Sequence, residues 1–169
     1  MSNIDINNKN LDIIKSKIYN WYTIQDQISI WKSENKKIVF TNGCFDILHL
    51  GHVEYLSKAS DLGDILIVGV NSDNSPYWLT KGPNRPINNQ DTRTIILSSL
   101  MFVDGVILFS DDTPLNVITM IMPDVLVKGK DYLAENIVGY DAVIMNGGEV
   151  KTIDLTEGYS TTNIIEKLL

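Results

Sequence analysis

The stretch KIVFTNGCFDILHLGHVEYLSKASDLG occupies residues 37–63 and contains two different periodicities. Its first five residues are mostly β-branched or aromatic, which is typical of a short strand. Apolar side chains then recur at helical spacing from Val53 to Leu62, and Gly63 is a typical helix end. The stretch therefore predicts a strand, a polar loop and a helix over 52–63.

The same alternation of strand and helix continues to the end of the chain. Further strands are predicted at 64–71, 104–109, 124–129 and 149–155, and further helices at 89–100, 113–123, 138–148 and 160–169. Such alternation forms a parallel sheet with helices on both faces. The predicted fold is α/β: a doubly wound, Rossmann-like, five-stranded parallel sheet over 36–169. Residues 1–35 are predicted to form an N-terminal helical extension.

Composition and charge narrow the classes of function. The net charge is −7 and the sequence pI is about 4.7, so a broad basic surface for nucleic acid is not expected. A membrane helix needs about 20 consecutive apolar residues, and no apolar run here approaches that length. The first ten residues also lack the pattern of a secretory signal. With Cys44 as the single cysteine, a cytoplasmic location is expected. The location of the few arginines suits a small anionic ligand.

The only two histidines, His49 and His52, stand three residues apart near the start of a predicted helix. A metal site would need further ligands, and a buried core position would need partners for the ring nitrogens. Side chains at this spacing face the same point, and Gly51 would allow a close approach to the backbone. A helix N-terminus adds free N–H groups and partial positive charge, so the pattern favours a phosphate site.

Other polar motifs follow the predicted strands, where ligands bind in open parallel sheets. These segments are 42–52, 71–93, 128–132 and 157–162. The second contains Lys81 and both arginines of the chain, Arg85 and Arg93, in a loop stiffened by two prolines. Phosphate contact is predicted for Lys81 and Arg93, whereas phosphate contact and a structural role are equally supported for Arg85.

The remaining motifs each allow two interpretations. Ser160 to Thr162 contain three successive hydroxyls, which either cap the last helix or also bind phosphate. Asp131 either caps a turn or contributes to a ligand site after the fourth strand, and Asp46 and Asp73 either cap local turns or face a substrate.

Together, TNGCFDILHLGH, KGPNRP, VLVKGKDY, NGGEV and EGYSTTNII resemble the motifs of the nucleotidyltransferase superfamily that includes the cytidylyltransferases. Within it, they are most similar to the D-glycero-D-manno-heptose 1-phosphate adenylyltransferases, which in many bacteria form half of a bifunctional protein with a sugar kinase. The resemblance covers about residues 36–169, with no room for a kinase domain. It implies a nucleotidyltransferase domain over 36–169.

The resemblance also implies roles for individual residues. His49, His52, Lys81 and Arg93 would be catalytic, and Asp46, Asp73 and Arg85 would bind the acceptor. The residues expected to bind the nucleotide are Asn42, Gly43, Phe45, Gly51, Lys128, Gly129, Asp131, Tyr159, Ser160, Thr161 and Thr162. No protein metal site is expected, because Mg²⁺ would be held mainly by nucleotide phosphates. Cys44 would be a small packing residue.

The implied reaction transfers AMP from ATP to a sugar 1-phosphate, with heptose 1-phosphate as the acceptor, and gives an ADP-sugar and pyrophosphate. The alternatives are cytidylyl transfer from CTP to glycerol 3-phosphate or another phospho-alcohol, and a nucleotide-binding module without catalysis. A homodimer is expected, with no nucleic-acid or membrane partner. One departure affects the acceptor: before KGPNRP the family usually carries basic residues, whereas this chain has Pro76-Tyr77-Trp78-Leu79-Thr80 and one extra residue.

Overall fold

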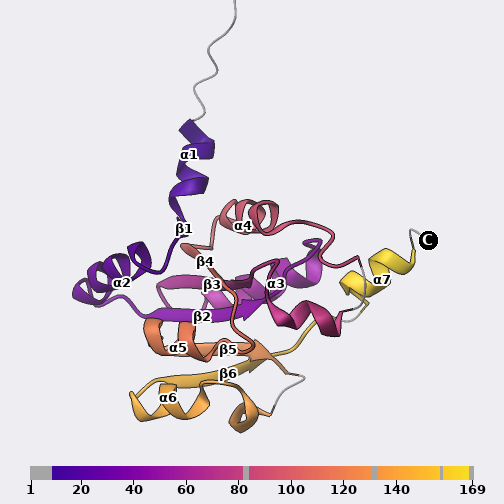
Figure 1. Cartoon of the computed structure of the whole chain (residues 1–169). Helices are drawn as coiled ribbons and strands as arrows, with labels where there is room; N and C mark the ends of the chain where they lie inside the picture. The colour runs from indigo at the N-terminus through magenta and orange to yellow at the C-terminus, as the bar shows by residue number, and fades with distance from the viewer. Residues whose placement is uncertain (1–8, 82–83, 131–132, 157, 168–169) are drawn as a thin grey trace, which may run out of the picture.

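A computed structural model describes residues 9–81, 84–130, 133–156 and 158–167. Its strands are β1 (Ile18–Tyr19), β2 (Ile38–Gly43), β3 (Ile65–Asn71), β4 (Gly105–Phe109), β5 (Val125–Gly129) and β6 (Glu149–Ile153). All neighbouring pairs are parallel, in the order β1-β4-β3-β2-β5-β6 (Figure 1). The five predicted strands are present and the Rossmann-like α/β class is confirmed, with β1 as a sixth strand.

The helices lie between the strands in sequence, as the alternation predicts. They are α1 (Lys9–Ser16), α2 (Thr23–Ser33), α3 (Leu50–Ser60), α4 (Gln90–Ser98), α5 (Leu115–Ile121), α6 (Tyr140–Met145) and α7 (Thr161–Glu166), with the 3₁₀ turns η1 (Pro76–Thr80) and η2 (Ala134–Asn136). Within the described ranges, none of the helices is both long and apolar enough to cross a bilayer.

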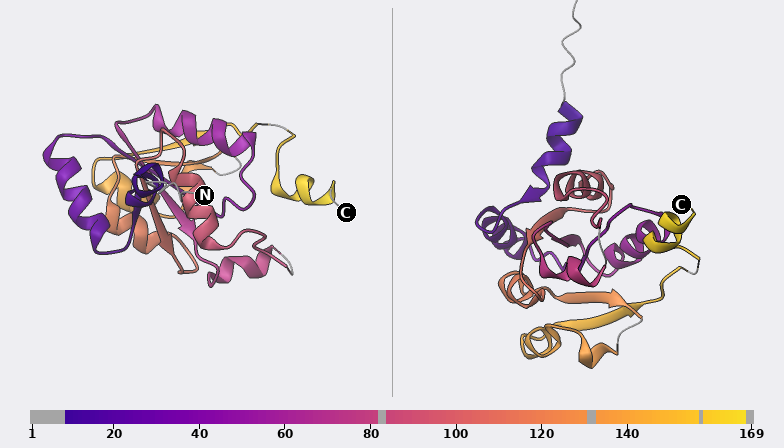
Figure 2. Two further views of the ribbon diagram at one scale, coloured as in Figure 1. Left: turned by 90° about the horizontal axis from the view of Figure 1, so that it is seen from above. Right: turned by 45° about the vertical axis from the view of Figure 1, so that its right-hand side comes forward.

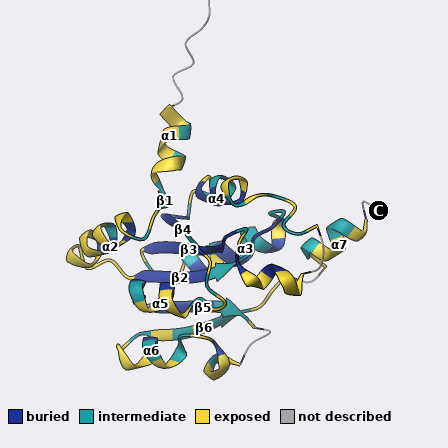
Figure 3. Ribbon diagram, in the orientation of Figure 1, coloured by how far each residue is buried: buried dark blue, intermediate teal, exposed yellow. Residues whose placement is uncertain are grey.

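The sheet is covered on both faces, so its central strands are apolar on both sides (Figure 3). Alternate residues of each strand point to opposite faces. Phe40 and Ile67 pack in one cluster with side chains from α2, α5 and α6, whereas Val39 and Val68 pack in the other with side chains from α3 and α4. The molecule thus has three layers with a core on each side of the sheet.

The N-terminal segment is helical, as predicted, but it is also part of the sheet. Its α2 buries Ile24, Ile28 and Trp31 against the sheet. Between the two helices, β1 pairs with β4, and Val106 N donates to Lys17 O at 2.8 Å. The sequence prediction missed β1 because a two-residue strand has no periodicity and forms only through this pairing. By contrast, α1 has no buried residue and projects from the body (Figures 1 and 2).

The sheet order places a topological switch point between β2 and β5. From β2 the chain proceeds through β3 to β4 on one side, and then crosses to β5 and β6 on the other. In open parallel sheets, this arrangement leaves a crevice beyond the carboxyl ends of the two central strands. The loops after β2 and β5 therefore flank the expected ligand position.

The starts of α3 to α7 differ from the sequence prediction by one or two residues. α3 begins at Leu50 rather than at residue 52, with the extended backbone of His49 as its N-cap residue. The predicted start was late because capping rules favour Ser, Thr, Asp or Asn, which this turn lacks. α5 begins at Leu115 rather than at residue 113, with Pro114 as its N-cap. The predicted loop that carries Lys81 contains η1, which Ser75 caps by accepting a hydrogen bond from Tyr77 N.

Candidate active site

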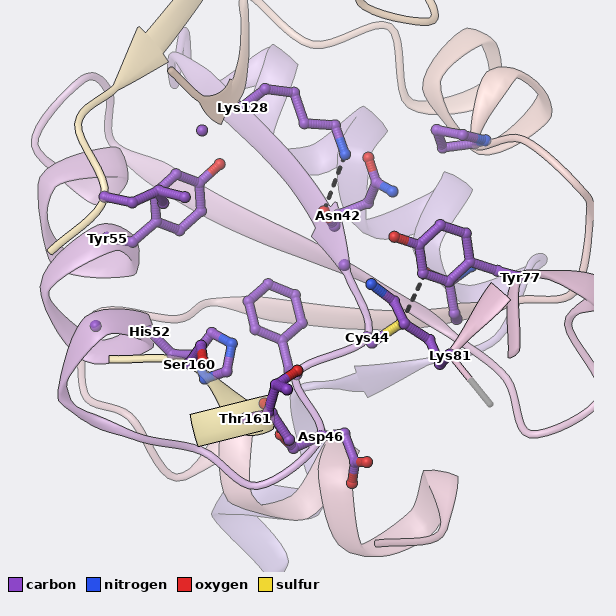
Figure 4. Close-up of a pocket in the computed structure, with 18 of the residues that line it drawn as sticks. Asn42, Cys44, Asp46, His52, Tyr55, Tyr77, Lys81, Lys128, Ser160 and Thr161 are labelled. Carbon is purple, nitrogen blue, oxygen red and sulfur yellow. Dashed lines mark hydrogen bonds between the residues drawn. The ribbon is translucent and has the colours of Figure 1, made fainter. Parts of the chain in front are cut away.

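A pocket of about 680 Å³ lies at the carboxyl ends of the strands (Figure 4). It is lined by most of the residues that the sequence singles out: Asn42, Gly43, Phe45, Asp46, His49, Gly51, His52, Lys81, Arg85, Lys128, Gly129, Tyr159, Ser160, Thr161 and Thr162. Asp73 and Arg93 are not among its lining residues. Asp131 lies outside the described residues. The pocket therefore unites segments that are more than 100 residues apart in sequence.

The two histidine rings stack on each other at the start of α3. Their centroids are 3.8 Å apart and their planes differ by 22°. The His49 backbone N–H donates to His52 Nδ1 over 3.4 Å, a long bond that leaves the proton of a neutral His52 ring on Nε2. His52 thus presents an N–H donor, which is the group that an oxyanion requires.

Both imidazoles are held neutral. Burial lowers the pKa of His52 to about 4, with a further lowering from His49 and an opposing effect of Asp46. Burial also lowers the pKa of His49. The Nδ1 atom of His49 is buried without a hydrogen-bond partner among the described residues. A bound anion would favour the charged forms, so the pair is suited to stabilise negative charge that appears during a reaction.

The stability of the ligand-free protein should fall when the pH drops below 6.5. Between pH 6.5 and about 4 the unfolded chain takes up a proton at His52 that the folded protein does not. The lowering of the pKa from 6.5 to about 4 corresponds to about 3 kcal/mol, and this loss is complete below about pH 4. Urea unfolding at neutral pH and at about pH 5 measures the onset of this loss.

The matched control for this effect is His52→Gln, which removes the titrating group and keeps a polar side chain. Carboxylates destabilise both proteins at low pH, so the informative quantity is the difference between the two profiles. We expect the variant to lose less stability than the parent over the same range. Parallel profiles would show that the His52 pKa is not lowered by the fold.

Gly51 is needed for packing between protein groups. A methyl group at this position would lie 3.1 Å from Tyr159 Cβ and 3.2 Å from His49 Cε1 and Nδ1. The close approach expected at this glycine is therefore made by the His49 ring. Tyr159 in turn stacks on His49, with ring centroids 6.4 Å apart and an interplanar angle of 27°. The C-terminal segment thus contacts the histidine pair directly.

A side-chain hydrogen bond joins the ends of the two paired strands at the switch-point crevice. Lys128 Nζ, at the end of β5, donates to Asn42 O, at the end of β2, over 3.0 Å (Figure 4). Asn42 Oδ1 is buried and has no partner among the described residues. An unsatisfied buried oxygen is costly, and a ligand donor such as an exocyclic amine or a ribose hydroxyl would satisfy it.

Lys81 is carried by η1, which is fixed to the sheet by a tryptophan. Trp78 is buried and its Nε1 donates to Ser72 O over 2.7 Å. At the pocket wall, Lys81 Nζ lies 4.9 Å from the centroid of the Tyr77 ring. The segment that departs from the family pattern therefore forms a rigid turn that presents an aromatic ring and a cation to the pocket.

Arg93 has a different position from the one predicted for a phosphate ligand. It is 1% exposed and lies under Trp78, with its Cζ 5.0 Å from the indole ring. Its guanidinium donates to Asn88 O, Cys44 O and the Asp73 carboxylate at 3.0, 2.7 and 2.6 Å. These contacts join the loops after β2 and β3. The sequence predicted that Arg93 contacts phosphate and that Asp73 contacts the acceptor. In the structure the two side chains instead bind each other and position the pocket wall.

Asp46 and Arg85 likewise bind each other rather than presenting two free charges. Arg85 Nε lies 2.7 Å from Asp46 Oδ2, and the Asp46 side chain is fully buried. The backbone N–H groups of Ile87 and Asn88 also donate to this carboxylate. Asp46 therefore braces the loop, and both Asp46 and Arg85 line the pocket, where their contact with a substrate stays a prediction.

The C-terminal hydroxyls serve the fold in part. Ser160 Oγ caps α7 by accepting from Asn163 N at 3.0 Å, and Thr161 Oγ1 donates to Asp46 O at 2.6 Å. A third attachment joins Thr156 to Glu54 of α3 by a hydrogen bond. Ser160 thus caps the helix, as the first interpretation predicts, whereas phosphate contact stays a prediction for these three residues, all of which line the pocket.

Sequence reasoning missed several parts of the pocket wall, two of which are segments that follow β4 and β5. The first is 112–114, after β4, which was interpreted only as a helix start. The second is 136–138, which follows η2. The position of Asp112 at the carboxyl end of a strand could have identified the first segment. No sequence signal marks the second. Cys44 also lines the pocket, and burial raises the pKa of its thiol to about 11, so it stays protonated.

Comparison with known proteins gives one family and a group of longer relatives. Residues 40–167 match the family described as cytidylyltransferase-like. The chain is 50% identical over 154 residues to the bifunctional protein HldE of Syntrophotalea carbinolica, covering 91% of this chain and 31% of that protein. It is 59% identical over 133 residues to the bifunctional protein HldE of Campylobacter concisus, covering 79% and 27%. The chain thus spans about a third of the length of these relatives.

Two solved structures are similar in fold. The lipopolysaccharide core biosynthesis protein from Thermoplasma volcanium has a TM-score of 0.59 and 29% identity, covering 74% of this chain and 99% of that one. The pantoate-beta-alanine ligase from Francisella tularensis has a TM-score of 0.56 and 18% identity, covering 88% and 75%. The second similarity concerns the fold alone.

Proposed function

The chain belongs to the cytidylyltransferase-like family of nucleotidyltransferases, and on this premise we propose that it transfers AMP from ATP to a sugar 1-phosphate. The observation that carries this proposal is the stacked, neutral pair of His49 and His52 at the pocket. Neutral donors beside a helix N-terminus suit a phosphoryl centre whose charge increases during the reaction.

The proposed acceptor is a heptose 1-phosphate, and the products are an ADP-sugar and pyrophosphate. Two observations support a sugar phosphate. The sequence motifs resemble those of the heptose 1-phosphate adenylyltransferases, and the HldE relatives match over most of this chain. The name of the Thermoplasma volcanium structure also refers to lipopolysaccharide core biosynthesis.

In the proposed mechanism, an acceptor phosphate oxygen attacks the α-phosphorus of ATP in line. A bond forms between these two atoms, and the bond from the α-phosphorus to the β-phosphate bridging oxygen breaks to release pyrophosphate. The protein supplies alignment and positive charge rather than a covalent nucleophile. His52 Nε2–H donates to an oxygen of the α-phosphate, and His49 lies against it.

Lys81 is proposed to bridge the attacking phosphate and the α-phosphate, because its exposed ammonium group stands at the pocket wall on the rigid turn η1. Thr162 and Arg85 lie at the pocket lining and would contact the outer phosphates. Arg93 would not contact the nucleotide. It would position the pocket wall by donating hydrogen bonds to the backbone carbonyls of Cys44 and Asn88. The cationic side chains thus surround one triphosphate.

Mg²⁺ is proposed as a cofactor carried by the nucleotide. Among the described residues, no three His, Cys, Asp or Glu side chains gather as a metal site, and the Asp46 carboxylate is occupied by Arg85 and backbone donors. This donor set fits an ion that is held through phosphate oxygens and keeps several waters. When bound, the ion would neutralise part of the phosphate charge.

A second candidate reaction is cytidylyl transfer to glycerol 3-phosphate or another phospho-alcohol. The description of the matched family favours it, since that family is cytidylyltransferase-like. The phosphate-handling residues would be the same in both reactions. Only the base and acceptor ends of the pocket would differ.

Pyrophosphate release with Mg²⁺, measured for ATP, CTP, GTP and UTP against several phosphorylated acceptors, tests the proposal. We expect ATP and a sugar 1-phosphate to give the highest kcat/KM. Preference for CTP with glycerol 3-phosphate would support the second candidate. Nucleotide binding without pyrophosphate release from any pair would identify a binding module and contradict both enzyme assignments.

A further inference from the structure

The lining of the pocket differs in character between its two sides. On the side of β5 and β6 it contains four apolar or aromatic residues beside three polar ones, namely Ile137, Val138, Leu155 and Tyr159 beside Lys128, Asn136 and Thr156. On the side of β3 and β4 it contains Tyr77, Lys81 and the 112–114 segment. An aromatic base suits the apolar side, because its faces gain from leaving water, whereas a phosphorylated, hydroxyl-rich molecule suits the polar side.

Asp112 provides a hydrogen-bond acceptor on the polar side. Two of the described lining residues carry a carboxylate, and the one at Asp46 is bonded to Arg85. The Asp112 side chain has no hydrogen bond or ion pair with any residue that the structure describes, although it lines the pocket. Its neighbour Asp111 accepts a hydrogen bond from Asn116 Nδ2 at 3.2 Å. Two adjacent carboxylates thus differ: Asp111 has a side-chain partner, whereas Asp112 is an exposed residue of the pocket lining.

The backbone places Asp112 on the same side of the pocket as Lys81. The ends of β3 and β4 are joined by a hydrogen bond from Ser72 N to Phe109 O and by a hydroxyl contact of 2.7 Å between Ser72 and Ser110. Lys81 follows β3 through η1, and Asp112 follows β4. Both side chains therefore belong to neighbouring loops at one edge of the pocket.

We propose that Asp112 determines acceptor specificity by accepting hydrogen bonds from hydroxyl groups of the acceptor, whose phosphate is bound at Lys81. The ligand class assigned to this end of the pocket is a polyhydroxylated phosphate, as in a sugar phosphate. This inference rests on the proposed nucleotidyl transfer. It adds which residue distinguishes a sugar from a simpler phospho-alcohol.

The chemistry of a carboxylate supports this choice of ligand. Asp112 repels a phosphate, so it suits the part of the acceptor that carries no negative charge. An ionised carboxylate accepts up to about four hydrogen bonds, and a pair of neighbouring sugar hydroxyls can bind both oxygens. A site built to bind hydroxyls rejects an analogue that lacks them, because its polar group is then left unpaired.

Steady-state kinetics of Asp112→Asn and Asp111→Asn in the full chain test the proposal. The amide keeps the size of the side chain but replaces one acceptor oxygen by a donor. We expect Asp112→Asn to raise the KM for a hexose 1-phosphate by about tenfold or more, with the KM for ATP unchanged. It should also reduce the discrimination against deoxy analogues. Asp111→Asn, in the same loop, should leave the acceptor KM within about twofold.

Several results would overturn the assignment. These are an acceptor KM for Asp112→Asn that stays close to that of the parent, equal increases in the KM of acceptor and nucleotide, or the same effect in Asp111→Asn. Preference of the parent for phosphocholine over sugar phosphates would also overturn it, because a cation would then be the partner of the carboxylate.

A calorimetric binding measurement separates this inference from the proposed reaction. If the parent releases no pyrophosphate with any sugar phosphate, the proposed function fails. Binding of a hexose 1-phosphate to the parent and to Asp112→Asn then decides the role of Asp112 independently. Weaker binding to the variant supports the role, and equal binding or no binding to the parent rejects it.

Discussion

His52→Ala is expected to lower kcat by about a hundredfold or more, the effect of removing one preorganised donor to an oxyanion. The donor atom would be Nε2 of His52. Its Nδ1 accepts a hydrogen bond from the His49 backbone, so the ring proton lies on Nε2. The KM for ATP should change much less, because the charge that His52 stabilises increases mainly in the transition state. Pyrophosphate release under saturating substrates measures the effect.

His52→Gln is the informative companion variant. Its amide nitrogen can reach the region of the imidazole Nε2 and donate a hydrogen bond, but it cannot exchange a proton near neutral pH. Partial recovery of kcat in His52→Gln relative to His52→Ala indicates a donor role, whereas equal loss in both indicates proton transfer. Near-normal turnover of His52→Ala, with correct folding shown by circular dichroism, would remove His52 from the mechanism.

Arg93→Met is expected to have the largest effect on stability, at about 3 kcal/mol, the lower end for breaking a buried ion pair. The lower end applies because the Asp73 side chain is 33% exposed and regains water when it loses its partner. The carbonyl groups of Cys44 and Asn88 lose their donors in the same variant. Urea unfolding at neutral pH measures the change in the free energy of unfolding.

Arg93→Met should also lower kcat by about a hundredfold. The variant loosens the loops of the pocket wall, and displacing a catalytic group by about 1 Å has an effect of this size. Arg93→Lys should recover little, because an ammonium group cannot reach three acceptors in different directions. Lys130→Met is the matched control, because its ion pair with Asp154 is exposed at 65% and 75% and is screened by water, so we expect stability close to that of the parent. Full stability of Arg93→Met would contradict the positioning role.

The β and α alternation could be predicted from sequence because each element leaves a local signal. Runs such as DILIVGVN indicate a buried strand by themselves, and the carboxyl ends of parallel strands must lie at one edge of the sheet. The segments containing His49, Lys81, Lys128 and Ser160 could therefore be predicted to meet at one pocket. β1 could not be predicted, because its two residues become a strand only by pairing with β4.

Side-chain partners were the less predictable part. Arg93 and a phosphate-binding arginine have the same sequence context, and only the three-dimensional packing under Trp78 distinguishes them. In the same way, Asp46 and Arg85 are 39 residues apart in sequence, and nothing in the sequence around either residue indicates that the two form an ion pair. The homodimer, the Mg²⁺ requirement and the cytoplasmic location stay predictions.

The position of α2 determines where this unit can be joined to other sequences. Ile24, Ile28 and Trp31 complete one core beside Ile118 and Ile121 of α5, so cutting the chain just before β2 would expose the part of that sheet face that α2 covers. A fusion point compatible with folding must therefore lie upstream of Lys17, whose backbone and side chain are already bonded to the body. Any longer polypeptide that carries this unit must either include the α2 segment or supply an apolar substitute for it.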